Sequence, residues 1–267
     1  MLAILLPVGD EKLFGALLFQ KNKDFKVYVN ENDPLAADYE TKLNLVHGTL
    51  EDVQEPLVAI LENGAVPDEN YVGRILRATE RHPDFDVYHM NLAGGGRRFP
   101  RKAGAKKVFK LTILENAAAP LSSFVFRTQK LREKAVLKAD GSLDTLPTVL
   151  SCAKDAPVRN IWMAELSWTA PALSADPAEV ERRIRARLDL LRWTESYFGD
   201  DDYPLSVGDQ LDLFAAETVK LYPSYSPEDL KEIMAGFQVS QGAIRKMRAS
   251  SALKSALKAR QKALQQA

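Results

Sequence analysis

Short apolar runs alternate with amphipathic segments over roughly the first 165 residues, and this order limits the folds that the chain can adopt. Strand-like runs lie near residues 3–7, 25–29, 58–61, 86–91 and 158–164, and helix-like stretches near 11–20, 38–46, 68–81 and 143–153. Residues 118–127 indicate a turn that leads into a further strand. Alternation of this kind is typical of a sheet whose strands are joined by crossover helices. The sequence therefore predicts an α/β fold with a mostly parallel sheet and flanking helices.

The pattern becomes purely helical beyond residue 172. Apolar residues recur at helical spacing from Val180 to Leu191, and two further helical stretches cover 208–221 and 227–237. The whole chain has 267 residues, 46% of them hydrophobic, which is enough for one large domain with a helical extension. We expect one domain over residues 1–172 and a helical region over 173–267.

Charge and cysteine content narrow the classes of partner. Lys plus Arg and Asp plus Glu each total 36, so no overall field favours nucleic acid or an anionic membrane. The single cysteine, Cys152, excludes an internal disulfide and suits a reducing compartment, and its apolar helical context indicates a buried, unreactive thiol. The apolar run LAILLP is too short to span a bilayer. These features predict a cytoplasmic protein.

Acidic and amide residues follow two of the predicted strands. Glu62 and Asn63 come directly after the strand at 58–61, and Asn30, Glu31 and Asp33 follow the strand at 25–29. Ligands of open α/β sheets bind outside the carboxyl ends of the strands. The positions indicate a nucleotide or phosphate site at this edge. An ordinary strand-to-helix turn with a solvated Glu62 is the alternative interpretation.

Two segments are locally basic. Residues 94–110 begin with three glycines and contain Arg97, Arg98, Arg101, Lys102, Lys106, Lys107 and Lys110. We expect a flexible basic loop, either solvated or holding an anion. The stretch 241–267 combines many Lys and Arg residues with a thin apolar stripe and has no acidic residue, so it could contact an anionic membrane or a partner, or pack along its own protein. Neither segment has the interleaved aromatic residues typical of nucleic-acid binding.

Histidine and serine residues give no separate catalytic signal. His47, His82 and His89 are not at metal-ligand spacing, and His82 falls at a helix end where a cation suits the helix dipole. Ser122 and Ser123 fit a turn better than a nucleophile, because no strand-turn-helix nucleophile motif surrounds them.

Four segments, in order, resemble the nucleotide-sugar glycosyltransferases with the GT-A fold, in particular the large inverting family two. AILLPV (3–8) is similar to the opening strand that ends in proline, and FKVYVNEND (25–33) to the second strand with its acidic turn. LENGAVPDENYVGRILRATERHPDFDVY (61–88) is similar to the stretch that starts at the family's acidic metal motif. APLSSFVFRTQKLRE (119–133) is similar to the strand before the acceptor site, followed by DGSLDTLPTVLSCA (140–153).

The resemblance implies a set of roles. Glu62 would hold Mn²⁺ or Mg²⁺, and Asp144 would be the catalytic base that takes the acceptor proton. Pro7, Asn30, Glu31, Asp33 and Asn63 would line the nucleotide, and Arg97, Arg98, Arg101 or Lys102 would neutralise the diphosphate. The donor would be a nucleotide sugar, UDP-linked by preference. The acceptor would be a saccharide or a cell-surface polymer, with 241–267 as a peripheral contact to the inner membrane surface or to a protein.

Several positions depart from that family pattern. The acidic motif is reduced to Glu62-Asn63-Gly64, and Leu143 occupies the place of the glutamate in the Glu-Asp pair. Only 28 residues separate the second strand from the strand at 58–61, so one crossover element is short or missing. A catalytically inert module that binds a partner protein or a saccharide, with the helical C-terminal region as its docking surface, is therefore the alternative function.

Overall fold

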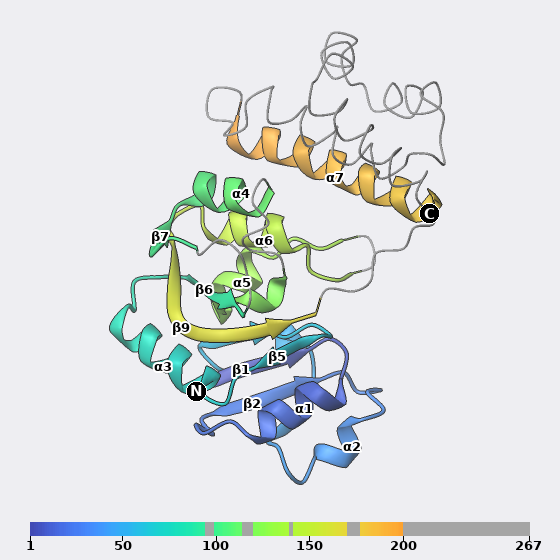
Figure 1. Ribbon diagram of the computed structural model, residues 1–267, viewed down its shortest axis with the longest axis vertical. Helices are drawn as coiled ribbons and strands as arrows, with labels where there is room; N and C mark the ends of the chain where they lie inside the picture. The colour runs from blue at the N-terminus through green and yellow to red at the C-terminus, as the bar shows by residue number, and fades with distance from the viewer. Residues whose placement is uncertain (94–98, 114–119, 139–140, 170–176, 200–267) are drawn as a thin grey trace, which may run out of the picture. The chain divides into compact units, whose positions relative to one another are not determined.

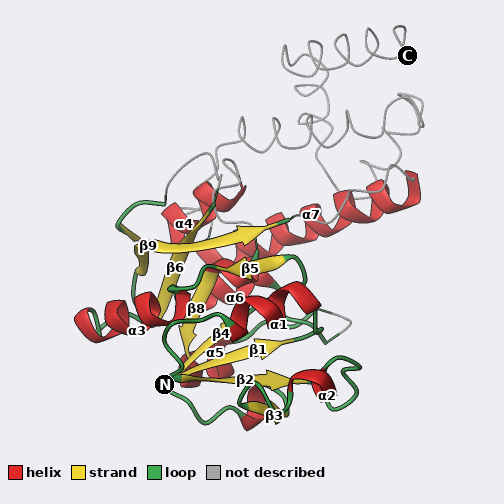
Figure 2. Cartoon of the chain, turned by 60° about the horizontal axis from the view of Figure 1, so that its bottom comes forward, coloured by secondary structure: helices red, strands yellow, loops and turns green. Residues whose placement is uncertain are grey.

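The computed structural model describes residues 1–93, 99–113, 120–138, 141–169 and 177–199. Within this part, nine strands form a single sheet in the order β3-β2-β1-β4-β8-β6-β9-β5, with β7 paired to β9 (Figures 1 and 2). The strands are β1 (Leu2–Leu6), β2 (Phe25–Val29), β3 (Leu45–His47), β4 (Leu57–Ile60), β5 (Ala65–Pro67), β6 (Val87–Leu92), β7 (Lys102–Ala103), β8 (Phe124–Arg127) and β9 (Val158–Trp168).

Strand directions confirm the predicted mostly parallel sheet. The pairs β1–β2, β1–β4, β2–β3 and β6–β9 are parallel, and β8 is antiparallel to both β4 and β6. Strands β1, β2, β3, β4, β6 and β9 therefore run in one direction, while β5, β7 and β8 run in the other. Strand order reverses at β1, whose neighbours are β2 and β4, and the crevice beyond the carboxyl ends of such strands is where open α/β sheets bind ligands.

The helices and 3₁₀ turns connect these strands. The α-helices are α1 (Glu11–Leu18), α2 (Ala36–Tyr39), α3 (Tyr71–Arg81), α4 (Ala105–Ile113), α5 (Thr128–Lys134), α6 (Thr145–Cys152) and α7 (Pro177–Phe198), and the 3₁₀ turns are η1 (Leu50–Asp52) and η2 (Leu121–Ser123). The connection from β3 to β4 contains only η1, so this crossover is short, as the sequence indicated. Helix α5 contacts β8, and α4 and α5 both contact α6.

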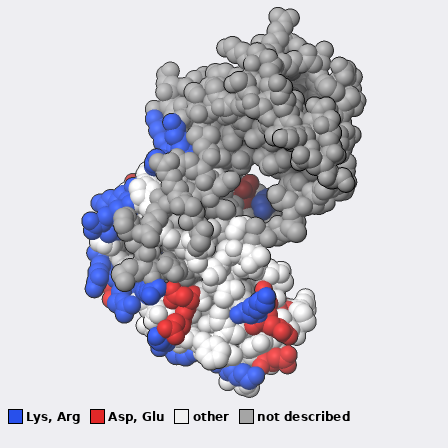
Figure 3. Space-filling model, viewed as in Figure 1, with Lys and Arg blue, Asp and Glu red and all other residues white. Residues whose placement is uncertain are grey.

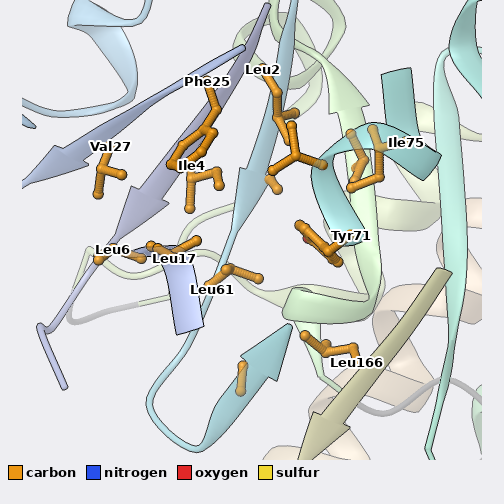
Figure 4. Close-up of a cluster of buried hydrophobic side chains, with 14 of the residues drawn as sticks. Leu2, Ile4, Leu6, Leu17, Phe25, Val27, Leu61, Tyr71, Ile75 and Leu166 are labelled. Atoms are coloured by element: carbon orange, nitrogen blue, oxygen red, sulfur yellow. The ribbon is translucent and has the colours of Figure 1, made fainter. Parts of the chain in front are cut away.

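The core lies where α1 and α3 meet the sheet. Leu13, Phe14 and Leu17 of α1 and Tyr71 and Ile75 of α3 are fully buried. Figure 4 shows Leu17, Tyr71 and Ile75 directed toward side chains of β1, β2 and the residue after β4. Complete burial of such a side chain contributes roughly 1.5–3 kcal/mol, so this cluster fixes β1 and β4 relative to each other.

Cys152 is buried on α6, as the sequence predicted. Burial raises the pKa of its thiol to about 12. The thiol therefore stays protonated at neutral pH, which agrees with an unreactive structural cysteine.

Four sequence predictions need correction. The stretch predicted as a helix over 38–46 is helical only to Tyr39 and ends in β3, and the turn after Glu62 contains β5. Helix α3 begins at Tyr71 rather than near Asp68, because Asp68 accepts the backbone N–H of Asn70 (2.6 Å) in a turn before the helix. Part of the predicted basic loop is ordered: Lys106, Lys107 and Lys110 lie on α4.

The chain divides into two compact units, Met1–Pro171 and Ala172–Ala267, which we describe separately. In the second unit the described element is α7, where Trp193 stacks on Tyr197 with 5.2 Å between ring centroids. The predicted helices at 208–221 and 227–237 and the basic stretch 241–267 lie outside the described residues. In the ranges given above, no helix is both long enough and apolar enough to cross a bilayer.

Candidate functional site

A cavity of about 660 Å³ opens at the carboxyl ends of β1 and β4. Pro7 and Val8 follow β1, Asn30 follows β2, and Glu62 and Asn63 follow β4; all of them line it. The rest of the described lining comes from η1 and the residue before it, η2, α5 and the segment between α5 and α6: Thr49, Leu50, Glu51, Leu121, Arg132, Ala135, Leu137, Lys138, Gly141, Ser142 and Leu143. The cavity lies at the edge of the sheet where the sequence predicted a ligand site.

Glu62 is held in this cavity by Ser122. The Glu62 backbone N–H donates to Ser122 Oγ at 2.7 Å, and the Ser122 N–H and hydroxyl lie 3.4 Å from Glu62 Oε2. Ser122 is fully buried, whereas Glu62 is partly exposed. Its carboxylate therefore borders a cavity instead of extending from a solvated turn, and Ser122 positions it. The sequence identified Ser122 only as a turn residue.

Gly64 occupies the third position of the segment that the sequence likened to an acidic metal motif. Its φ is +86°, a conformation that strains side-chain-bearing residues. A Cβ at this position would lie 2.7 Å from the backbone oxygen of Thr169, which itself donates its N–H to Gly64 O (3.0 Å). An aspartate at 64 would therefore clash with the strand-end backbone. The close approach of Thr169 therefore leaves no room for a side chain at position 64.

The predicted nucleotide-side residues divide into two groups. The Asn30 amide donates to Pro7 O at 2.7 Å, so two of the predicted residues form one corner of the cavity. Asp33 instead accepts the N–H of Gly9 at 2.6 Å and that of Leu35 at 3.0 Å, which ties the loop after β1 to the loop after β2. Neither Asp33 nor Glu31 is among the described residues that line the cavity.

Asp144 lies beside the cavity at the N-terminal end of α6. Its backbone N–H donates to Val136 O (2.7 Å), and Lys138 N–H donates to Ser142 O (2.7 Å), so residues 136–138 pair with residues 142–144 in antiparallel fashion beside the cavity. The Asp144 carboxyl makes no capping bond to α6. Partial burial raises its pKa above the ordinary aspartate value, and the nearby Lys138 ammonium opposes this rise. A raised carboxyl pKa suits a base that exchanges a proton near neutral pH.

Among the described residues, two cations line the cavity, and neither was predicted. The Arg132 guanidinium donates to the backbone oxygens of Leu50 (2.9 Å), Glu51 (2.8 Å) and Val53, so it caps η1. Lys138 is exposed and is the cation of this pair left to face an anionic ligand.

The basic residues that the sequence favoured lie elsewhere. Arg97 and Arg98 lie outside the described residues. Arg101 lines a different cavity, and the Lys102 ammonium lies over the Phe85 ring, 5.3 Å from its centroid. Neither Arg101 nor Lys102 therefore supplies charge beside Glu62.

The donor set does not fit a metal ion held by the protein alone. In the described ranges, no three His, Cys, Asp or Glu side chains gather where they could bind one ion. Glu62 offers a single carboxylate, Asn63 is exposed, and Gly64 has no side chain. Hard divalent cations prefer several oxygen ligands.

Neither protein-family models nor curated protein sequences match this chain. Solved structures do match, at low identity. Staphylococcus aureus TarS is 13% identical with a TM-score of 0.49, over 85% of this chain and 44% of the TarS chain. TarS 1–349 with UDP is 12% identical with a TM-score of 0.48, over 85% of this chain and 73% of that one.

A second similar protein is glucosyl-3-phosphoglycerate synthase from Mycobacterium tuberculosis, in complex with Mn²⁺, UDP and glucosyl-3-phosphoglycerate. It is 11% identical with a TM-score of 0.48, over 71% of this chain and 79% of that one. This chain spans less than half of the TarS chain, 44%, so the activity of the whole TarS protein is not transferred to it. The α/β fold of this chain is established by its own strand order and strand directions, and not by these similarities.

Proposed function

We propose that the cavity beside Glu62 binds a nucleotide sugar and that the protein transfers the sugar to a saccharide or cell-surface polymer. The observation that carries this proposal is the convergence of Pro7, Asn30, Glu62 and Asn63 on one cavity. These residues come from three separate strand ends; the sequence pattern indicated Asn30, Glu62 and Asn63, and the family resemblance implied Pro7. A cavity of about 660 Å³ is within the usual size range of small-molecule sites, roughly 300–1,000 Å³.

Each of these residues would have a separate role in an inverting transfer. The Asn30–Pro7 corner would receive the nucleoside, and the Lys138 ammonium would offset the charge that builds on the departing diphosphate. The acceptor hydroxyl oxygen would form the new bond to the anomeric carbon while the bond to the diphosphate breaks. Asp144 would take the hydroxyl proton, which its raised pKa favours.

Thermal unfolding in the presence of UDP, UDP-sugars and other nucleoside diphosphates, with and without Mn²⁺, tests donor binding. UDP is the first probe because the resemblance in sequence implies a UDP-linked donor. A ligand at 100 times its dissociation constant adds about 2.7 kcal/mol to the free energy of unfolding. We expect UDP to raise the midpoint, and Lys138→Gln to reduce the rise because it removes the cation facing the diphosphate.

Glu62→Gln probes the carboxylate, and Glu40→Gln is the matched control. Glu40 is exposed at the end of α2 and does not line the cavity. If Mn²⁺ enhances UDP binding through Glu62, Glu62→Gln removes that enhancement and Glu40→Gln keeps it. No rise with any nucleoside diphosphate at millimolar concentration contradicts the proposal.

A catalytically inert GT-A-like module that binds a saccharide or a partner protein is the second candidate. Two features favour this module. The segment Glu62-Asn63-Gly64 keeps only one carboxylate, and Leu143, which lines the cavity, stands where the resemblance implies a glutamate. Binding of UDP without turnover over a broad panel of donors and acceptors would support this module over the enzyme.

A further inference from the structure

A second cavity, of about 440 Å³, has an arginine-rich lining. Arg74, Arg77 and Arg81 of α3, Arg101 before β7 and Arg159 of β9 all border it, together with His82. We call it the arginine cavity. Figure 3 shows Lys and Arg side chains gathered over the part of the surface where Figure 1 places α3 and β7.

The arginine cavity is separate from the cavity beside Glu62. Arg159 and Asn160 pair with Tyr88 and His89, so they lie at the amino ends of β9 and β6. Glu62 follows the carboxyl end of β4, and strands β4, β6 and β9 run in the same direction. The two cavities therefore lie at opposite edges of the sheet, and they share no lining residue among those described.

Helix α3 aligns three of the arginines by its period. Arg74, Arg77 and Arg81 recur three and four positions apart, which places them on one face of the helix. Val72, Ile75 and Thr79 are buried on another face. Burial of that face fixes the helix rotation, so the three arginines are presented together toward the cavity.

Most of this positive charge lacks a carboxylate partner within the described residues. Arg74 pairs with Asp68 at 2.6 Å. In the same part of the chain, no carboxylate lies within ion-pair distance of Arg77, Arg81, Arg101 or Arg159. Arg159 is only 7% exposed; it donates to His82 Nε2 at 2.8 Å and lies 5.8 Å from the Phe85 ring centroid. Concentrated like charge in a concave site attracts anions.

His82 lies within the field of these cations. Burial lowers the pKa of His82, and the charges of Arg159, Arg101, Lys102 and Arg81 lower it further. The sequence indicated a helix end where a cation suits the dipole, whereas burial and the neighbouring cations both favour the neutral ring. A neutral Nε2 can accept the Arg159 hydrogen bond, which a protonated ring could not do.

We propose that the arginine cavity binds a small soluble molecule bearing one or more phosphate groups. Guanidinium groups match phosphate because their planar N–H pairs bond two oxygens at once. The concave shape favours a compact ligand over an extended polymer, which would need a long open track of charge. Because this edge of the sheet is opposite to the Glu62 cavity, the ligand is an effector or an anchoring group, and the site does not depend on the proposed transfer reaction.

NMR titration of the histidine ring signals, with and without millimolar pyrophosphate at constant ionic strength, tests the site. We expect pyrophosphate to raise the His82 pKa, because a bound anion offsets the surrounding arginine charges. His47 lies on β3, at the lateral edge of the sheet, and serves as an internal control. The Arg77→Gln/Arg81→Gln variant should lose most of the pyrophosphate-induced rise. Lys23→Gln/Lys42→Gln, which removes the same charge from exposed positions, should keep it.

Three results would overturn the proposal. The first is a His82 pKa that pyrophosphate does not change in the native protein, and the second is a change that persists in the arginine variant. The third is loss of the change in Lys138→Gln, which would place the anion in the Glu62 cavity instead. Arg77 and Arg81 are exposed, so circular dichroism should show both variants folded. Failure of UDP to bind leaves these outcomes unaffected, so the two proposals fail separately.

Discussion

At the scale of single residues, position relative to a strand end decided which site residues were predictable. Pro7, Asn30, Glu62 and Asn63 each follow a strand closely, and all line the cavity. Asp33 also follows a strand, but its carboxylate binds Gly9, where a Cβ would come within 2.5 Å of Asp33 Oδ2. Nothing near residue 33 in the sequence shows that pairing. Ser122 was missed as a positioning residue for the same reason, since its partner Glu62 is 60 positions away.

Asp144 gives a prediction about the pH dependence of any sugar transfer. A carboxyl that acts as a base is active when deprotonated, and burial raises its pKa. Turnover should therefore be full at pH values above this raised pKa and should fall as pH drops through it. The measurement is the pH profile of kcat/KM for the native protein and for Asp144→Asn, with Asp38→Asn as a control at an exposed helix position.

Asp144→Asn should lower kcat by roughly 10²–10⁴-fold, the usual contribution of a positioned base. UDP binding should stay close to native, because Asp144 is outside the described lining of the cavity. A variant that keeps native turnover would remove Asp144 from the mechanism and leave the cavity as a binding site alone.

At the scale of elements, the length of its apolar run decided whether a strand could be predicted from the sequence. The buried runs of β1, β2 and β4 gave clear strand signals, and their predicted bounds agree with the structure to within a residue. Strands β3 and β5 have three residues each, too few for a period to appear. Helix α4 was predicted as part of a basic loop because of its lysines, although its Val108, Phe109 and Leu111 are buried.

Arg132 gives a prediction about an element that forms the cavity wall. Its guanidinium on α5 caps η1 through three backbone oxygens, a long-range link that the local sequence does not reveal. Arg132→Met should lower the free energy of unfolding by roughly 1–3 kcal/mol, because three backbone carbonyl groups, two of them in partly buried hydrogen bonds, lose a charged donor. Chemical denaturation measures this change.

Lys134→Met on the same helix is the control for Arg132→Met. Its effect should be small, since Arg132 and not Lys134 supplies the described hydrogen bonds to η1. Weaker UDP binding in Arg132→Met alone would show that η1 supports the proposed donor site. Equal stability of the two variants would contradict the capping role.

At the scale of the whole molecule, equal numbers of acidic and basic residues do not mean that the charges are evenly distributed. Acidic and basic residues are equal in number at 36 each, so the composition indicated no overall field that favours nucleic acid or an anionic membrane. The fold nevertheless brings Arg101 and Arg159, from two later segments of the chain, to the arginines of α3. Composition could not show this gathering, because it depends on pairing between β7 and β9 and on the position of α3 against β9.

The stretch 241–267 carries a charge bias that is already visible in the sequence. It contains Arg245, Lys246, Arg248, Lys254, Lys258, Arg260 and Lys262 and no acidic residue. We propose that it provides peripheral contact with an anionic membrane, where each Lys or Arg near the surface contributes about 1 kcal/mol. The full chain should sediment with vesicles containing phosphatidylserine and stay in solution with neutral vesicles. Deletion of 241–267 should abolish sedimentation.

The arginine cavity makes this experiment more demanding, because its cations could also attract anionic vesicles. The Arg77→Gln/Arg81→Gln variant separates the two sources of charge within the same assay. If 241–267 supplies the contact, this variant sediments like the native protein, and high salt releases both, since surface attraction is screened within a Debye length. If the deleted protein still sediments and the arginine variant does not, the basic stretch is not the membrane contact, and the arginine cavity recognises lipid phosphate instead of a soluble ligand.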